Sequence, residues 1–127
     1  MKTRHSRLWL STGCLVAVVA LMAGAIGSHL VEEGPARESF ETAATYHFYA
    51  SLSIITGAIL SMLWQSKLWL LCFILALTGI VCFSGSLYIK ALAISETAPL
   101  GPIGGICIMA SWGILALESM RGAFATE

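Results

Sequence analysis

Four apolar runs divide the sequence, and short polar segments separate them. The runs extend over about residues 8–31, 46–64, 68–92 and 101–120. At about 1.5 Å per residue, helices of these lengths approach or cross a hydrocarbon layer of roughly 30 Å. No long polar region interrupts the series. The pattern therefore predicts an all-α fold, a polytopic membrane protein whose four-transmembrane-helix bundle forms a single integral membrane domain over residues 1–127.

The connecting segments predict where the helices begin. Pro35 follows an acidic stretch, and because proline is favoured in a first helical turn, the second helix is expected to start there, outside the membrane. The segment 65–67 is long enough only for a tight antiparallel hairpin, with Trp64 and Trp69 expected at the membrane interface. A segment rich in proline and glycine, which includes Pro102, is expected to break the chain before the fourth helix.

Composition supports the membrane assignment and excludes several functions. Hydrophobic residues make up 57% of the chain and charged residues 11%, too few to coat a soluble surface. The formal net charge is zero, so no nucleic-acid partner is expected. The sequence contains no phosphate-binding loop, CxxC pair or HExxH motif. We therefore expect neither a cofactor nor a metal site, and no enzyme activity.

Four cysteines lie inside the apolar runs, and their spacing matches no metal-binding pattern. Buried cysteine usually behaves as a small hydrophobic residue. A packing role is therefore expected for Cys14, Cys72, Cys82 and Cys107.

The amino terminus allows two interpretations. Basic residues followed by an apolar run also fit a signal peptide, and the stretch 11–14 resembles a lipoprotein cleavage site. However, only three apolar residues, 8–10, precede that stretch, and the apolar run then continues to Val31. A retained first transmembrane helix is the favoured interpretation.

Basic residues predict the orientation, because lysine and arginine are enriched in cytoplasmic segments. Five fall on the side of the two termini and two on the other, where five glutamates, among them Glu96, also lie. Both termini are therefore expected in the cytoplasm. The five are Lys2, Arg4, Arg7, Lys67 and Arg121, and the two are Arg37 and Lys90.

Small residues at four-residue spacing predict faces on which the helices approach one another, as transmembrane helices do in lipid. Leucine at Gly24 is accordingly expected to overpack the bundle. The expected packing residues are Ala20, Gly24 and Ser28 in the first run, Ser53, Gly57 and Ser61 in the second, Thr78, Cys82, Gly85 and Ser86 in the third, and Gly101 and Gly105 in the fourth.

Polar residues gather near the outer ends of the runs, and an ionisable group inside a membrane is a candidate functional site. His29 has Glu32 within helical reach, and for His29 a buried hydrogen bond that fixes the second helix against the first is favoured over proton or ligand handling. Metal binding by two of the histidines is a weaker alternative. The candidate cluster consists of His29, Glu41, His47, Ser84, Ser86, Tyr88 and Lys90.

The stretch 83–92 contains four of these residues and has two interpretations. It is either a site, such as a proton path or a ligand pocket, or the point where a helix leaves the bilayer. The second is favoured. The two serines then pack and hydrogen-bond, Tyr88 anchors in the interfacial aromatic belt, and Lys90 extends toward the headgroups.

Four ordered motifs resemble the small four-span membrane family catalogued as domain of unknown function 423. They are Gly24-Ala25-Ile26-Gly27-Ser28-His29, Phe40-Glu41-Thr42-Ala43-Ala44-Thr45-Tyr46, Phe83-Ser84-Gly85-Ser86-Leu87-Tyr88 and Pro102-Ile103-Gly104-Gly105. The resemblance extends from about residue 10 to about residue 118. It implies four helices in a bacterial inner membrane and brings no established activity.

One position departs from the family pattern. The resemblance implies a histidine four residues after Tyr46, but this chain has Ala50 there. His47 lies three residues earlier on the same helical face. The departure argues against a strict catalytic use of this histidine.

Two functions follow as expectations. The leading one is a structural or accessory subunit that lies in the lipid bilayer and packs against other membrane protein subunits or against itself. The alternative is a small carrier or channel with an outer vestibule formed by His29, Glu41, His47 and Lys90. An enzyme ranks last, because no nucleophile, base and orienting group converge by spacing.

Overall fold

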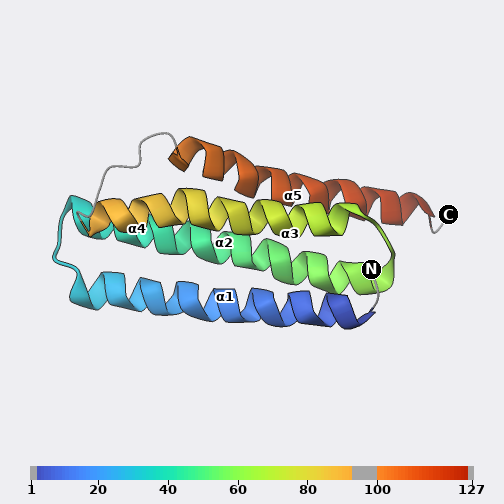
Figure 1. Cartoon of the computed structure of the whole chain (residues 1–127), viewed down its shortest axis with the longest axis horizontal. Helices are drawn as coiled ribbons and strands as arrows, with labels where there is room; N and C mark the ends of the chain where they lie inside the picture. The colour runs from blue at the N-terminus through green and yellow to red at the C-terminus, as the bar shows by residue number, and fades with distance from the viewer. Residues whose placement is uncertain (1–2, 93–99, 126–127) are drawn as a thin grey trace.

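The structure is a computed structural model that describes residues 3–92 and 100–125. Four long helical rods lie side by side, each long and apolar enough to cross a membrane (Figure 1). The first two are α1 (Thr3–Leu30) and α2 (Pro35–Leu63), the third joins α3 (Leu68–Gly79), the π-helical η1 (Ile80–Ser84) and α4 (Gly85–Ala91), and the fourth is α5 (Leu100–Ala125). The predicted all-α fold with four transmembrane helices is confirmed.

The rods alternate in direction. The start of α1 and the end of α5 lie at the same end of the bundle, here called the terminal end (Figure 1). The opposite end, here called the distal end, carries the α1–α2 connection and the start of α5. Lys2 and Glu96, which contributed to the expected orientation, lie outside the described residues.

Local sequence explains the turns between the first three rods. Gly34 has φ 132°, a conformation that favours glycine, and α2 begins at the next residue, Pro35. At the other hairpin, the Ser66 hydroxyl accepts a hydrogen bond at 3.1 Å from the N–H of Leu68, the first residue of α3. Pro102 does not break the chain as expected. It lies in the first turn of α5, where a missing N–H costs no helical hydrogen bond.

The central helix is α2. In its most apolar stretch, 44% of the residues are buried, against 22% for α1 and for α5. α1 packs mainly on α2, whereas α5 packs mainly on α3 and η1. Trp69 lies in the core and not at the interface as expected, because its indole N–H donates to the Trp64 carbonyl at 3.2 Å. The core comprises Ala50, Ile54, Ala58, Trp69, Cys72, Phe73, Ala76, Ile108 and Leu115.

The helices approach one another most closely at glycines. On α1 these glycines are Gly13 and Gly27, and not Gly24 as expected. A β-carbon at Gly27 would lie 2.8 Å from Cδ1 of Phe40, and one at Gly13 2.8 Å from Cγ1 of Ile55. At Gly24 it would meet nothing within 4 Å. The overpacking expected from leucine at Gly24 therefore does not follow, because α1 and α2 touch on either side of Gly24 and leave space beside it.

A similar difference occurs where α5 meets the third rod. The tight contacts involve Gly79, whose added β-carbon would collide with Ile108, and Gly104, whose added β-carbon would collide with the backbone of Phe83. The expected glycines are looser: a β-carbon at Gly101 would lie 3.8 Å from the Ser86 hydroxyl, and one at Gly105 would lie 3.6 Å from the Phe83 ring. On α2, a β-carbon at Gly57 would lie 2.9 Å from Cε1 of Phe73, so this expected glycine does make a close contact.

The π-helical segment changes which face of the third rod is buried. Before it, Cys72, Ala76 and Gly79 are buried, whereas after it the buried residues are Ser84 and Ser86. A π-turn holds an extra residue, so the faces before and after it fall out of register. Thr78, expected on the packing face, is exposed for this reason. A β-carbon added at Gly85 would meet only the carbonyl of Ile80 in its own rod, at 3.8 Å.

Candidate functional site

At the distal end, two polar contacts join α2 to the third rod. The Nδ1 atom of His47 lies 3.2 Å from the Tyr88 hydroxyl, and the imidazole is only 6% exposed. The Ser84 hydroxyl donates to the carbonyl of Ala43 at 2.7 Å. The Tyr88 ring also packs edge-on against Phe40, so Tyr88 points into the bundle and not toward the aromatic belt as expected. Two members of the candidate cluster, His47 and Tyr88, are thus brought into contact here.

The other members of the cluster lie apart from this pair. Ser86 donates to the carbonyl of Phe83 within its own rod, at 2.8 Å. Lys90 is exposed. His29 and Glu32 are both exposed, and His29 makes no hydrogen bond to any described residue. The buried hydrogen bond that His29 was expected to make between the first two helices is therefore wrong. The rotation of α1 about its own axis explains this, because it turns Gly27 toward α2 and His29 away from it.

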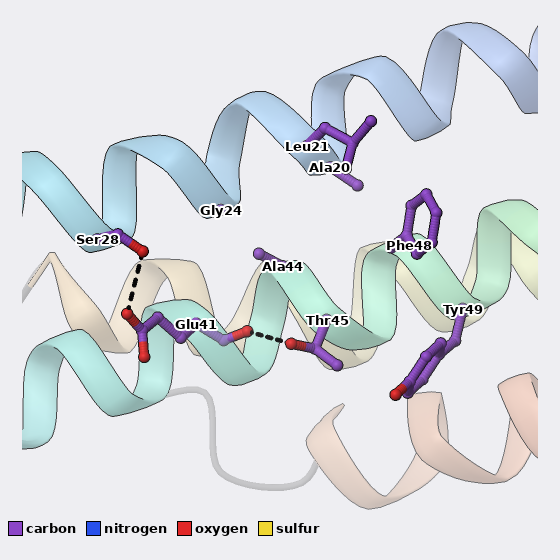
Figure 2. A pocket seen from close by; sticks show the side chains of 9 residues that line it. All are labelled: Ala20, Leu21, Gly24, Ser28, Glu41, Ala44, Thr45, Phe48 and Tyr49. Atoms are coloured by element: carbon purple, nitrogen blue, oxygen red, sulfur yellow. Dashed lines mark hydrogen bonds between the residues drawn. The ribbon is translucent and has the colours of Figure 1, made fainter.

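Ser28 and Glu41 provide the contact between α1 and α2 that His29 was expected to make. The Ser28 hydroxyl donates to the Glu41 carboxylate at 3.3 Å. Both residues line an open groove of about 580 Å³ between the two helices. Figure 2 shows Ser28 and Glu41 reaching toward each other at one end of the groove, and Phe48 pointing toward α1 at the other.

Buried serines join helices in the middle of the bundle and near its terminal end. The Ser111 hydroxyl of α5 donates to the Ser53 hydroxyl of α2 at 3.1 Å. The Ser61 hydroxyl lies 2.8 Å from that of Ser6 on α1. Each pair also bonds to a helix carbonyl, as Ser111 does to Ile108 at 2.7 Å. Such hydroxyls tie helices together without carrying charge.

Sequence reasoning missed a buried carboxylate near the terminal end. Glu118 is 2% exposed, and its two oxygens accept hydrogen bonds from the Trp64 indole at 3.3 Å and from the Arg121 guanidinium at 2.9 Å. Helical spacing offered a signal, because Ser111, Leu115 and Glu118 lie on one face of α5. Glu118 also borders a cavity of about 500 Å³, together with its two partners Trp64 and Arg121.

The cysteines and potential metal ligands form no shared site. Cys72 is buried, Cys82 and Cys107 are half-buried, and Cys14 is exposed on the outer side of α1. Over residues 3–92 and 100–125, no group of three histidine, cysteine or acidic side chains is arranged to hold a metal ion. His29 and His47, the weaker metal alternative, differ in burial, the first exposed and the second buried.

Comparison with known proteins identifies the family of this chain. The family described as "Protein of unknown function (DUF423)" matches residues 23–105. A UPF0382 membrane protein of Staphylococcus saprophyticus is 32% identical over 123 residues, which cover 91% of this chain and 98% of the relative. The chain belongs to the DUF423 family. A UPF0382 membrane protein of Staphylococcus epidermidis is also 32% identical, over 92% of this chain and 98% of its own length.

A relative of lower identity also matches over nearly the whole length of both chains. The UPF0382 membrane protein YwdK of Bacillus subtilis is 29% identical, over 91% of this chain and 98% of its own length. No solved structure matches the chain significantly. The DUF423 match includes the His47–Tyr88 pair, η1 and the groove except Ala20 and Leu21, whereas Glu118 lies beyond it. The chain is thus a multi-pass membrane protein of a family whose activity is unknown.

Proposed function

We propose that this DUF423 protein is a structural or accessory membrane subunit without enzyme activity, which packs against other membrane proteins or against a second copy of itself. One observation supports this most. Within the described residues, no buried side-chain nitrogen or oxygen lacks a hydrogen-bond partner. Because the buried polar groups already bond to other groups of the bundle, several of them between helices, they are not free to bind a substrate.

A carrier receives less support. Carriers place substrate and ion sites near the bilayer midplane, between helices. Here the polar groups near the middle of the rods are hydroxyls paired with each other, such as Ser53 with Ser111. Ile54 and Phe73 fill the adjoining core, and each is fully buried. The four residues of the expected vestibule do not converge, since His29 and Lys90 are exposed and His47 is buried.

The outer helices provide surfaces for a partner. α1 and α5 leave large apolar side chains exposed along their length, for example Leu15 and Val18 on α1, and Ile106 and Met109 on α5. Lipid tails cover such faces as well as another helix does, so association there depends on packing and hydrogen bonding. We place the partner interface on one of these two helices.

We also propose that the terminal end faces the cytoplasm of a bacterial inner membrane. Arg4, Arg7, Lys67 and Arg121 belong to the terminal end. Arg37 and Lys90 are the basic residues that the described chain places at the distal end. This distribution supports the orientation by the positive-inside rule.

Site-specific photocrosslinking in intact membranes tests the proposed role. A photoreactive residue is placed at Val18 on α1 or at Met109 on α5, both exposed. Lys67, exposed in the α2–α3 connection, is the matched control. We expect a discrete protein adduct, a chain dimer or one heterologous partner, from one helix position and none from Lys67. Absence of protein adducts from both helices would contradict the proposal.

A further inference from the structure

The groove between α1 and α2 is bounded by contact at each end. Gly13 approaches Ile55, and Gly27 approaches Phe40, so the helices touch at both places. Between them Gly24 faces open space. The volume of about 580 Å³ therefore results from a local separation of two helices that pack closely on either side, and it opens where lipid surrounds the bundle.

The groove has a polar end and an apolar end. Ser28 and Glu41 form the polar end, near the distal ends of their helices, whereas Leu21 and Phe48 line the apolar end (Figure 2). The two ends are about seven residues apart along each helix, which corresponds to about 11 Å at 1.5 Å per residue. Polar and apolar parts are thus arranged like the headgroup and the start of an acyl chain of a membrane lipid.

The charge at the polar end selects the headgroup. The Glu41 carboxylate receives one hydrogen bond, from Ser28, and no basic side chain of the described chain pairs with it. Arg37, one turn earlier, is held elsewhere, because its guanidinium donates to the Val31 carbonyl at 2.8 and 2.6 Å and pairs with Glu33 at 3.4 Å. A carboxylate without a protein cation at the membrane surface favours a cationic ligand.

We propose that this groove binds a phospholipid with a primary ammonium headgroup, of the phosphatidylethanolamine type. The ammonium donates hydrogen bonds to the Glu41 carboxylate, which a quaternary ammonium cannot do. One acyl chain lies along Gly24 and Ala44 toward Phe48. An anionic headgroup such as phosphatidylglycerol is repelled at the same place. This lipid site does not depend on the proposed role as an accessory subunit.

Native mass spectrometry of the full chain in mild detergent tests the proposal, with phosphatidylethanolamine, phosphatidylcholine and phosphatidylglycerol supplied in equal amounts. We expect phosphatidylethanolamine adducts to dominate. Glu41→Gln should weaken this binding about tenfold, the effect of losing one charge-assisted hydrogen bond. The matched control is Glu38→Gln, because Glu38 is exposed on the same helix and does not line the groove.

A second variant tests the acyl-chain part. Gly24→Leu fills the groove and should reduce binding of all three lipids, whereas Ala25→Leu, on an exposed neighbour outside the groove, should leave it unchanged. Circular dichroism verifies that the variants remain helical. Equal binding of phosphatidylglycerol by the native chain, or an unchanged preference in Glu41→Gln, would overturn the proposal. So would a photoreactive residue at Thr45 that captures protein and not lipid in native membranes.

Discussion

The Ser84 hydroxyl donates a 2.7 Å hydrogen bond to the carbonyl of Ala43, 41 positions earlier in the chain. Ser84 is the last residue of the π-helical segment, and it is fully buried. The bond therefore fixes the point at which the third rod changes its buried face against the central helix. Single π-turns inside α-helices are frequent at functional sites.

Replacing this serine should weaken the bundle. Ser84→Ala removes an interhelical hydrogen bond, and such bonds contribute about 0.6 kcal/mol on average and up to about 1.7 kcal/mol in membrane proteins. Ser86→Ala is the matched control, because the Ser86 hydroxyl bonds only to Phe83 in its own rod. Chemical unfolding in micelles measures both. Equal losses in the two variants would contradict a special role for Ser84.

Glycines on α1 and on the third rod should differ in their tolerance of a methyl group. Gly79→Ala places a β-carbon against Ile108 and the carbonyl of Gly104, so we expect a loss of about 1–3 kcal/mol from overpacking. Gly24→Ala meets no neighbour and should be neutral or stabilising, since alanine favours helix. Thermal unfolding in the same detergent compares them. A destabilised Gly24→Ala would show that the helices close there.

The number and type of helices could be predicted from the sequence, because that information is local. Run length and hydropathy define the rods, and Pro35 marks the start of α2. The faces in contact could not be predicted as well. Ala20 shares a helix face with Gly24, four residues later, and with Gly27, seven residues later. Which of the two glycines meets α2 depends on Phe40, a residue of that other helix.

The candidate site was predictable in composition but not in geometry. Sequence located the polar residues near one end, yet which of them meet depends on rotation about each helix axis. His29 turns away from α2 while Ser28 reaches Glu41, although the two are adjacent in sequence. Glu118 was missed because its partner Trp64 lies 54 positions away, beyond any helical spacing.

Loss of the Glu118 carboxylate should destabilise the terminal end. Glu118→Leu leaves the indole N–H of the half-buried Trp64 without its acceptor, and an unsatisfied donor costs about 1–3 kcal/mol where it is buried. Arg121→Gln should cost less, because the Arg121 side chain is 62% exposed and the indole bond remains. Unfolding in micelles provides the comparison. A larger loss in Arg121→Gln than in Glu118→Leu would mean that the ion pair, and not the indole bond, matters more.

The orientation can be tested with reporter fusions. A reporter active only in the cytoplasm should be active when fused after Ala125 and inactive when inserted at Arg37, because the basic residues favour a cytoplasmic terminal end. A reporter active only outside the cytoplasm provides the complementary control at both positions. Cytoplasmic activity at Arg37 would reverse the proposed orientation.

The two histidines near the distal end should behave differently, because only one has a partner in the described structure. Tyr88→Phe keeps the ring contact with Phe40 and removes the hydroxyl, and His47→Leu removes the imidazole. Each should lower the free energy of unfolding by about 0.5–1.5 kcal/mol, the usual net contribution of one hydrogen bond.

The double variant decides whether the two residues act together. If the bond between His47 and Tyr88 is the common cause, His47→Leu combined with Tyr88→Phe should cost less than the sum of the single losses. His29→Leu and His29→Gln serve as controls, and both should be nearly neutral because His29 is exposed. Strict additivity at the pair, or a marked loss in either His29 variant, would contradict this assignment of roles to the distal histidines.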